Sequence, residues 1–221
     1  MRLSLVPLLT FGAVYFVIFG YAPLRIADFL IPNSQPSSWI LAIILVAPAA
    51  AWLSYRPWHN SITRTALRGA YLWLGVCFVA LMILLPFEVI AWLADLRPPV
   101  AGQIALCAVA LTCTLALANA FRFRIREVDI RSDKLTQELR LVHISDVHIG
   151  SRHPGFLARV VDKVREMRPD LVAITGDLVD FEGVSGDDLS PLAKIDVPVY
   201  FCIGNHERYV DCDAICARLE A

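Results

Sequence analysis

The 221-residue sequence predicts four membrane-spanning helices over residues 1–121, followed by an α/β region with a parallel sheet over residues 122–221. The composition is one reason, because 57% of the residues are hydrophobic and 19% are charged, both far from the averages of soluble proteins. The long uncharged runs lie in the first region, whereas the second has an ordinary soluble composition. In the second region short apolar segments alternate with helical patterns, which is typical of βαβ units.

Four stretches are long and apolar enough to cross a membrane, because a helix needs about 20 residues to span a hydrocarbon core of about 30 Å. The stretches are residues 3–24, 39–55, 69–87 and 98–121. The first could instead be a signal peptide with Arg2 as its basic start. We favour a retained helix, since three further spans follow and no small-x-small cleavage site stands out.

The arginines predict the orientation, because loops rich in arginine stay on the cytoplasmic side. With four crossings, the N-terminus, the loop after the second span and the C-terminal region share one side. The arginines of that side are Arg2, Arg56, Arg64, Arg68, Arg122, Arg124 and Arg126. The opposite loops hold Arg25 and Arg97, accompanied by Asp28 and Asp95. The sequence therefore predicts an integral inner- or plasma-membrane protein whose C-terminal domain faces the cytoplasm.

Two features of the membrane region have a functional and a structural interpretation. Glu88 ends the third apolar run, and an acid inside a membrane is a functional candidate. Its predicted place near the outer surface favours an ordinary hydrated carboxylate. The fourth span contains small residues, Ala105, Ala108, Ala110 and Ala116, which indicate close helix packing. Almost no charge lies inside the spans, which argues against a transporter or channel.

The second region opens with residues 121–130, where apolar and polar side chains alternate as in a half-buried strand. Three further strands are predicted at residues 139–145, 171–175 and 197–203. A helix begins at Pro154, and a short one covers residues 189–194. The apolar face of the first helix is Leu157, Val160, Val161, Val164 and Met167. This order predicts a parallel sheet with right-handed crossovers.

Polar residues follow directly after three of these strands. They are Asp146 and His148, then Asp177 and Asp180, then Asn205 and His206. Because ligand sites form beyond the carboxyl ends of parallel strands, we expect these side chains at one edge of the sheet. Gly176 and Gly204 stand before Asp177 and Asn205, where a missing side chain permits a sharp turn or a close backbone approach.

Carboxylate, imidazole and amide groups suit manganese, iron or zinc ions. A carboxylate such as Asp177 can bridge two cations. Two bound cations clamp the attacking and leaving oxygens of a phosphoryl displacement and lower the pKa of bound water. His206 could then reach the phosphate or the leaving oxygen as a general acid or charge stabiliser. The sequence therefore predicts a two-metal phosphoesterase site.

The three motifs resemble those of the calcineurin-like metallophosphoesterase family, whose signature is D-x-H, GD-x-x-D and GNH-[ED]. They read Asp146-Val147-His148, Gly176-Asp177-Leu178-Val179-Asp180 and Gly204-Asn205-His206-Glu207. The residues around them are similar to the bacterial membrane-anchored branch, over about residues 125–221. The resemblance implies a partial α/β metallophosphoesterase domain, half of a layered α/β sandwich.

The resemblance also implies a role for each residue and a cofactor of two divalent metal ions. Asp146 and His148 would bind the first metal, Asp177 would bridge both, Asn205 would bind the second, and His206 would be catalytic rather than a ligand, with Asp180 and Glu207 orienting the ligands. We expect His143, inside a strand, to be a packed core residue. His153 is a weak candidate for substrate binding.

The family pattern continues beyond the third motif with a lone histidine and a Gly-His-x-His motif, which complete both metal sites. The other histidines of this chain, His59, His143 and His153, do not fit those positions. We therefore expect the C-terminal part of the domain to be absent, as in a fragment, a truncated product or a degenerate relative. The alternative function is a non-catalytic membrane binding or scaffold protein derived from this fold.

The expected partners are the membrane and a phosphate ester, either a monoester or a diester. A membrane location alone suggests a lipid-linked substrate. A net charge of −1 gives no basic field for nucleic acid. Among the six cysteines, Cys212 and Cys216 are four residues apart, but a zinc site there would need two more ligands. We interpret all six as ordinary reduced thiols, and the oligomeric state stays open.

Overall fold

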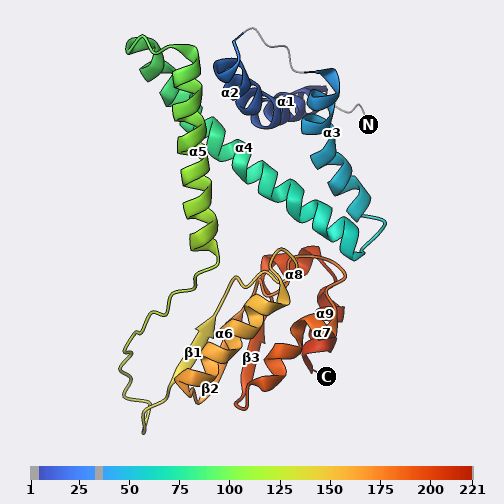
Figure 1. The fold of residues 1–221 in the computed structure, drawn as a ribbon. Coiled ribbons are helices and arrows are strands. Elements are labelled where there is room, and N and C mark those ends of the chain that lie inside the picture. Colours follow the sequence, from blue (N-terminus) through green and yellow to red (C-terminus); the bar gives the residue numbers. More distant parts are fainter. Residues whose placement is uncertain (1–4, 33–36, 221) are drawn as a thin grey trace. The chain divides into compact units, whose positions relative to one another are not determined.

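A computed structural model describes residues 5–32 and 37–220 of the chain (Figure 1). The chain divides into two compact units, Met1–Ala120 and Phe121–Ala221. Arg2, predicted on the cytoplasmic side, and residues 33–36, between the first two predicted spans, lie outside the described residues.

Among its described residues, the first unit contains helices joined by short turns and no strand. Its elements are α1 (Leu5–Phe16), the π-type turn η1 (Val17–Tyr21), α2 (Ala22–Leu30), α3 (Ser38–Tyr55), α4 (Ser61–Leu93) and α5 (Pro98–Ala120). The first three run on as one helical stretch, because Tyr21 and Ala22 at the junctions both have α-helical backbone angles. Four helices are long and apolar enough to cross a membrane, Leu9–Leu30, Ser38–Tyr55, Ser61–Leu93 and Pro98–Ala120. The predicted four-helix membrane region is confirmed at this level.

The sequence favoured an ordinary hydrated carboxylate for Glu88, but the structure shows this carboxylate hydrogen-bonded to other side chains. Its Oε1 atom accepts hydrogen bonds from the Tyr21 hydroxyl at 2.8 Å and from Arg25 Nε at 2.6 Å. Arg25 also pairs with Asp28 at 2.8 Å. The prediction that Arg25 and Asp28 lie in a loop is wrong, because the first helix continues to Leu30 and their charges are compensated by each other and by Glu88.

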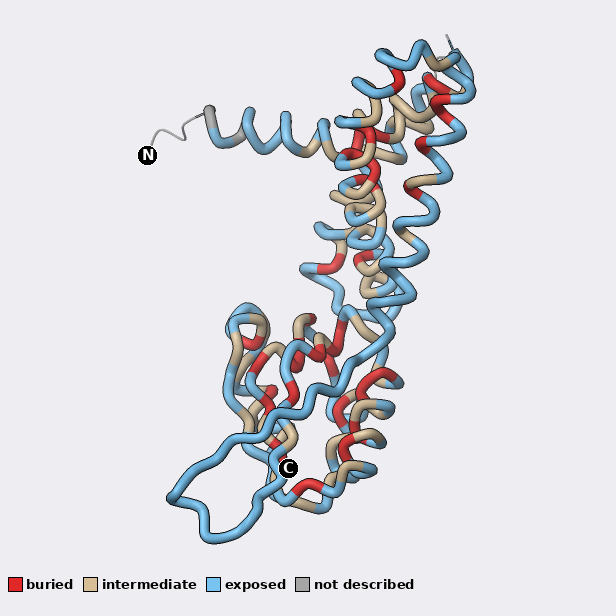
Figure 2. The backbone as a smooth tube through the Cα atoms, turned by 90° about the vertical axis from the view of Figure 1, so that its left-hand side faces the viewer, coloured by how far each residue is buried: buried red, intermediate tan, exposed pale blue. Residues whose placement is uncertain are grey.

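Small residues bring α5 close to α2. A methyl group on Gly102 would lie 2.9 Å from the Leu30 backbone nitrogen, so a larger residue would not fit there. Ala105 is fully buried beside it, as predicted, but Ala110 and Ala116 are exposed. Much of the helical unit is exposed (Figure 2), and many of its exposed residues are large and apolar, as expected for helices that lipid surrounds.

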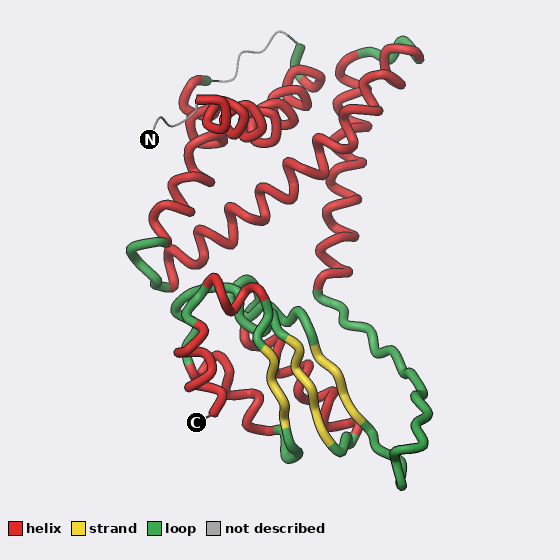
Figure 3. The backbone as a smooth tube through the Cα atoms, turned by 180° about the vertical axis from the view of Figure 1, so that it is seen from behind, coloured by secondary structure: helices red, strands yellow, loops and turns green. Residues whose placement is uncertain are grey.

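The second unit contains a three-stranded parallel sheet in the order β1-β2-β3. Its elements are β1 (Leu141–Ile144), α6 (Pro154–Met167), β2 (Leu171–Thr175), α7 (Gly186–Leu189), the 3₁₀ helix η2 (Ser190–Lys194), β3 (Val199–Cys202), α8 (Asn205–Tyr209) and α9 (Cys212–Glu220). The predicted α/β class is confirmed, and the three strands lie within their predicted ranges. Figures 1 and 3 show the helices gathered over one face of this sheet.

The core of the second unit lies between the sheet and α6. Phe156, Leu157, Val161 and Val164 of the helix are buried against the sheet side that carries Ile174. His143 lies on the other side of the sheet. The prediction of a packed core histidine is wrong, since His143 is exposed and its Nε2 atom lies 2.6 Å from Thr175 Oγ1.

The predicted strand at residues 121–130 is also wrong. Residues 121–140 form an irregular, exposed segment (Figure 2), with no strand assigned between Ala120 and Leu141. Period-two alternation indicates which side chains share a face, but a strand also needs a neighbouring strand to satisfy its backbone groups. This segment pairs with no strand among the described residues.

Candidate metal centre

The loops that follow the three strands meet at the carboxyl edge of the sheet. Backbone hydrogen bonds join the first two loops, with His148 N donating to Asp177 O at 2.9 Å and Ile149 N donating to Leu178 O at 2.7 Å. Asp146 and His148 follow β1, Asp177 and Asp180 follow β2, and Asn205, His206 and Glu207 follow β3. The predicted gathering of these loops at one edge is confirmed.

Two glycines allow the second and third loops to touch. A methyl group on Gly176 would lie 2.5 Å from Gly204 Cα, and Gly176 has a φ of +79°. A methyl group on Gly204 would lie 2.3 Å from Asp177 Oδ1 and 2.5 Å from Asp177 N. Any side chain at either position would push the loops apart, so the glycines set the distance between Asp177 and His206.

Glu207 also links the loops after β2 and β3. Its side chain is 0% exposed. One carboxylate oxygen accepts hydrogen bonds from Asp177 N at 2.9 Å and Gly204 N at 2.8 Å, and the other accepts from Val179 N at 2.9 Å. Three backbone N–H groups therefore satisfy this buried carboxylate, which fits its predicted role in positioning neighbouring residues.

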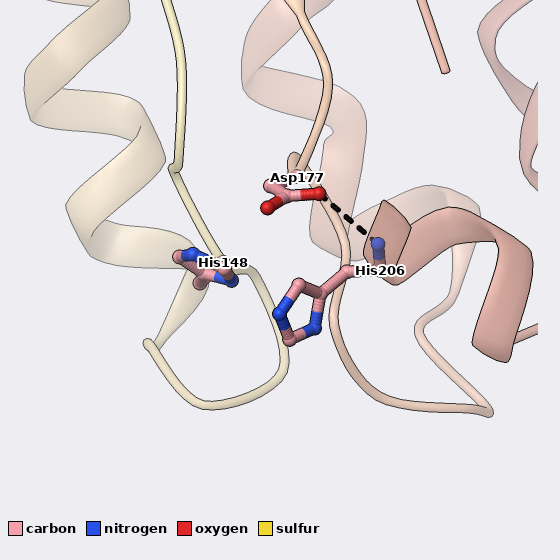
Figure 4. Close-up of side chains that lie close together, drawn as sticks. All are labelled: His148, Asp177 and His206. Carbon is pink, nitrogen blue, oxygen red and sulfur yellow. Dashed lines mark hydrogen bonds between the residues drawn. The ribbon is translucent and has the colours of Figure 1, made fainter. Parts of the chain in front are cut away.

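The side chains of His148, Asp177 and His206 lie close together (Figure 4). Each offers one possible ligand atom, and these atoms all lie within 4.8 Å of one another. Among the histidine, cysteine and acidic residues that the structure describes, this is the one such group, so Cys212 and Cys216 do not form a second. One carboxylate and two imidazoles are a donor set that suits manganese, iron or zinc.

The surroundings restrict the three side chains. The backbone N–H of His206 donates to Asp177 Oδ1 at 3.0 Å. The His148 and His206 rings stand edge to face with centroids 4.7 Å apart. His148 Nδ1 lies 3.5 Å from Asp180 Oδ2, whose side chain is 7% exposed. A carboxylate behind an imidazole fixes the orientation of a metal-binding histidine.

Three candidate residues have backbone angles that L-amino acids rarely adopt. The φ angles of Asp146, His148 and Asp177 are +58°, +55° and +54°. Such angles cost roughly 1–3 kcal/mol each and persist where the surrounding structure enforces them, often at functional sites. The sequence motif alone did not reveal this strain.

The structure thus brings together His148, Asp177 and His206, two predicted ligands and the predicted catalytic residue. Asp146 lies next to them, with Oδ1 3.8 Å from His148 Nε2, but its side chain is 66% exposed. Asn205 is exposed at the first residue of α8. The individual roles predicted for these residues stay predictions.

Three residues near the site contribute features that the motifs did not predict. Ser151 donates its N–H to Asp180 Oδ1 at 2.9 Å, and its hydroxyl also donates to Asp180. Tyr209 stands edge to face with His206, at a centroid distance of 6.5 Å. His153 caps α6, because its Nδ1 atom accepts from Gly155 N at 3.1 Å. The Pro154 helix start could have suggested this cap.

Comparison with known proteins agrees with this site. Residues 139–220 match the model of the calcineurin-like phosphoesterase family. An uncharacterized metallophosphoesterase of Campylobacter jejuni is 32% identical over 92 residues, which are 38% of this chain and 24% of the relative. A "transmembrane protein with metallophosphoesterase domain" of Danio rerio is 36% identical over 115 residues, 48% of this chain and 26% of the relative.

A third relative carries a more specific name. The UDP-2,3-diacylglucosamine pyrophosphatase LpxG of Chlamydia muridarum is 32% identical over 74 residues, 31% of this chain and 22% of the relative. No solved structure matched the chain. The matched segments span about a quarter of the length of these relatives. The resemblance to the calcineurin-like family is confirmed, and its relatives are both bacterial and eukaryotic.

Proposed function

We propose that this chain, whose residues 139–220 match the calcineurin-like phosphoesterase family, contributes to a membrane-bound, metal-dependent phosphoesterase. The observation that carries the proposal is the convergence of His148, Asp177 and His206 within 4.8 Å at the carboxyl edge of a parallel sheet. The reaction would be hydrolysis of a phosphate monoester or diester. The four apolar helices support the membrane location.

The donor set fits divalent ions, and the proposed roles follow the sequence. Asp146 and His148 would hold one ion, Asn205 would hold a second, and Asp177 would lie between them. When bound, such ions polarise a phosphate ester and make hydroxide available near neutral pH. His206 would donate a proton to the leaving oxygen or stabilise its charge. Asp180 and Glu207 would keep His148 and Asp177 in place.

The substrate proposal rests on location and on one relative. A helical membrane anchor keeps a catalytic domain near lipids, which favours a lipid-linked phosphate ester. The Chlamydia muridarum relative is named for the pyrophosphate of a diacylated sugar nucleotide. We further propose, from the arginine asymmetry, that the C-terminal unit faces the cytoplasm.

The test uses the full chain in lipid nanodiscs. Metal content is measured by elemental analysis, and hydrolysis of bis(p-nitrophenyl) phosphate and p-nitrophenyl phosphate is measured with added manganese. We expect Asp177→Asn to lower metal affinity and rate by about 100-fold or more, since even residues behind the ligands change metal affinity by 10–100-fold. Asp187→Asn is the matched control, because Asp187 is exposed in α7.

His206→Gln separates two roles that the geometry allows. If His206 is catalytic, the variant keeps its metal and loses turnover; if it is a ligand, metal affinity falls as well. The three donor residues found close together would also suit a single ion. The alternative function is a non-catalytic binding or scaffold protein. Metal binding without turnover by the wild type would support that alternative, and no metal binding would refute the proposal.

A further inference from the structure

We propose that the segment leaving the fourth membrane helix forms, with the start of α6, a surface that binds anionic phospholipid headgroups. This juxtamembrane patch consists of residues 121–126 together with Arg152, Phe156 and Arg159. All of its residues belong to the second unit. The proposal goes beyond the phosphoesterase function and does not depend on it.

The segment is held on α6 although it has no regular secondary structure. The Phe123 ring stands edge to face on the buried Phe156 ring, with centroids 6.1 Å apart and planes at 86°. Arg159 Nη2 donates to Phe121 O at 3.5 Å. An edge-to-face aromatic pair is a favourable geometry, so these contacts give the segment a defined place on the domain.

The patch is strongly cationic in an otherwise mixed surface. Arg122, Arg124 and Arg126 are exposed, and among the described residues none of them pairs with a carboxylate. The guanidinium groups of Arg152 and Arg159 stand 4.3 Å and 5.3 Å from the centre of the Phe156 ring. Guanidinium groups match phosphate geometry through paired N–H donors.

Acidic residues lie at the margins of the patch. Glu127 and Asp129 follow it along the chain, and Asp162 lies one helical turn beyond Arg159. Within residues 121–126 there is no acid. The local charge is therefore positive, whatever the balance of the whole unit.

The position of the patch selects lipid over other anionic partners. The candidate span ends at Ala120, and Arg122 is two residues further on. Basic residues this close to a bilayer lie within the reach of its surface potential, each contributing about 1 kcal/mol. Phe121, Phe123 and Ile125, which are 60%, 40% and 47% exposed, alternate with the arginines. Apolar and basic side chains together are typical of membrane-interface segments.

One consequence, unlike the binding itself, rests on the proposed function. Arg152 N donates to His148 O at 2.9 Å, so the loop that carries a candidate metal ligand also carries part of the patch. Lipid binding by the patch would keep the rim of the site close to the headgroups. A phosphate ester embedded in the membrane could then enter without leaving the interface.

The test compares amide hydrogen exchange of the full chain in two kinds of nanodisc. One contains phosphatidylcholine alone, and in the other about a third of the lipid is phosphatidylglycerol. We expect exchange of residues 121–126 to slow by about fivefold or more in the anionic nanodiscs, the factor that corresponds to one arginine at the surface. We expect the difference to vanish at molar salt, which screens charges beyond about 3 Å.

Matched variants separate this patch from a general charge effect. Arg122→Gln, Arg124→Gln and Arg126→Gln together should abolish the slowing. Arg165→Gln and Arg168→Gln at the C-terminal end of α6, together with Lys194→Gln at the end of η2, remove the same charge and should preserve the slowing. Equal exchange of the wild type in both nanodiscs, or loss of the slowing in the control variant, would overturn the proposal. Neither outcome depends on catalysis, so it leaves the phosphoesterase proposal standing.

Discussion

At the scale of single residues, Glu207 links the loops that carry Asp177 and His206. A fully buried carboxylate is stable only when its oxygens are satisfied, and here three backbone N–H groups do so. The side chain therefore determines local geometry rather than contacting a substrate. Its place directly after His206 in the sequence explains why the motif extends to a fourth residue.

The first prediction concerns removal of this carboxylate. Glu207→Ala leaves one buried and two partly buried N–H groups without an acceptor. An unsatisfied buried group costs about 1–3 kcal/mol, so we expect faster amide exchange in β2 and β3 and weaker metal binding. Glu207→Gln keeps one acceptor oxygen and should show a smaller effect. Glu166→Ala is the control, because that side chain is 64% exposed and forms an ion pair only with Lys163 among the described residues. Equal effects of the two alanine variants would contradict the positioning role.

The strained angles of Asp146, His148 and Asp177 show a limit of sequence reasoning at this scale. The residue types and their spacing predicted the edge of the sheet where they lie. The left-handed backbone at each position depends on contacts between loops, such as His148 N to Asp177 O, that are distant in sequence. Side-chain chemistry is visible in a motif, whereas an enforced backbone angle is not.

At the scale of elements, the contact between the loops after β2 and β3 depends on a missing side chain. Gly204 has a φ of −90°, which any residue can adopt, so the restriction there is space and not conformation. The nearest atoms, Asp177 N and Asp177 Oδ1, belong to a candidate ligand.

The second prediction uses this restriction. Gly204→Ala should destabilise the loop pair by about 1–3 kcal/mol and lower metal affinity, because the added methyl group overpacks the contact. Gly186→Ala is the matched control, since nothing lies within 4 Å of a methyl group there and exposed changes usually stay within about 0.5 kcal/mol. Metal titration and amide exchange of β3 measure both variants. A Gly204→Ala variant that behaves like Gly186→Ala would refute the close approach.

A predicted strand was confirmed where its apolar side chains are buried and its backbone also pairs with neighbouring strands. Residues 171–175 form β2 as predicted, because Val172 and Ile174 are buried and both edges of the strand are paired. Residues 121–130 carry a similar alternation, but no strand pairs with them among the described residues, and Ile130 is 81% exposed. Partner availability is a property of the whole sheet and cannot be read from one segment.

The third prediction concerns the contact between α2 and α4. Glu88→Gln leaves Arg25 without its closest charged partner, so we expect the first unit to lose up to about 1.5–3 kcal/mol, the range for hydrogen bonds to charged groups. Asp28→Asn removes the other partner, whose side chain is 54% exposed, and should have a smaller effect. Thermal unfolding in nanodiscs, followed by the tryptophan fluorescence of the first unit, measures the difference. The opposite order of effects would show that Asp28 is the principal partner.

At the scale of the whole molecule, the two units differ in which side chains they expose, as expected if lipid surrounds the first and water surrounds the second. Outward side chains of the helical unit are apolar and exposed, whereas the second unit buries Leu157, Val161 and Val172 between helix and sheet. The break near Ala120 could be read from composition, because the charge density changes there abruptly. The ends of the spans could not, since α4 extends over Ser61–Leu93 and so carries Arg64 and Arg68 inside the helix.

The proposed orientation of the chain rests on where the arginines lie relative to the spans. Arg56 follows α3, Arg64 and Arg68 lie in the first turns of α4, and Arg122 follows α5. All four are at span ends that an even number of crossings places on one side. Arg25, in contrast, is compensated by Asp28 and Glu88 and adds little to the asymmetry. This distribution of charge is the basis of our proposal that the C-terminal unit faces the cytoplasm.

The fourth prediction tests that orientation with reporter fusions. Green fluorescent protein fused after Ala221 should fluoresce, because it folds in the cytoplasm, and alkaline phosphatase fused there should be inactive. Fusion after Asp95, between α4 and α5, is the matched control and should give the reverse result, since one crossing separates the two positions. Active alkaline phosphatase after Ala221 would place the candidate metal centre outside the cytoplasm. Its substrates would then have to be sought on the opposite face of the membrane, and the arginines after α5 would need another explanation than retention by charge.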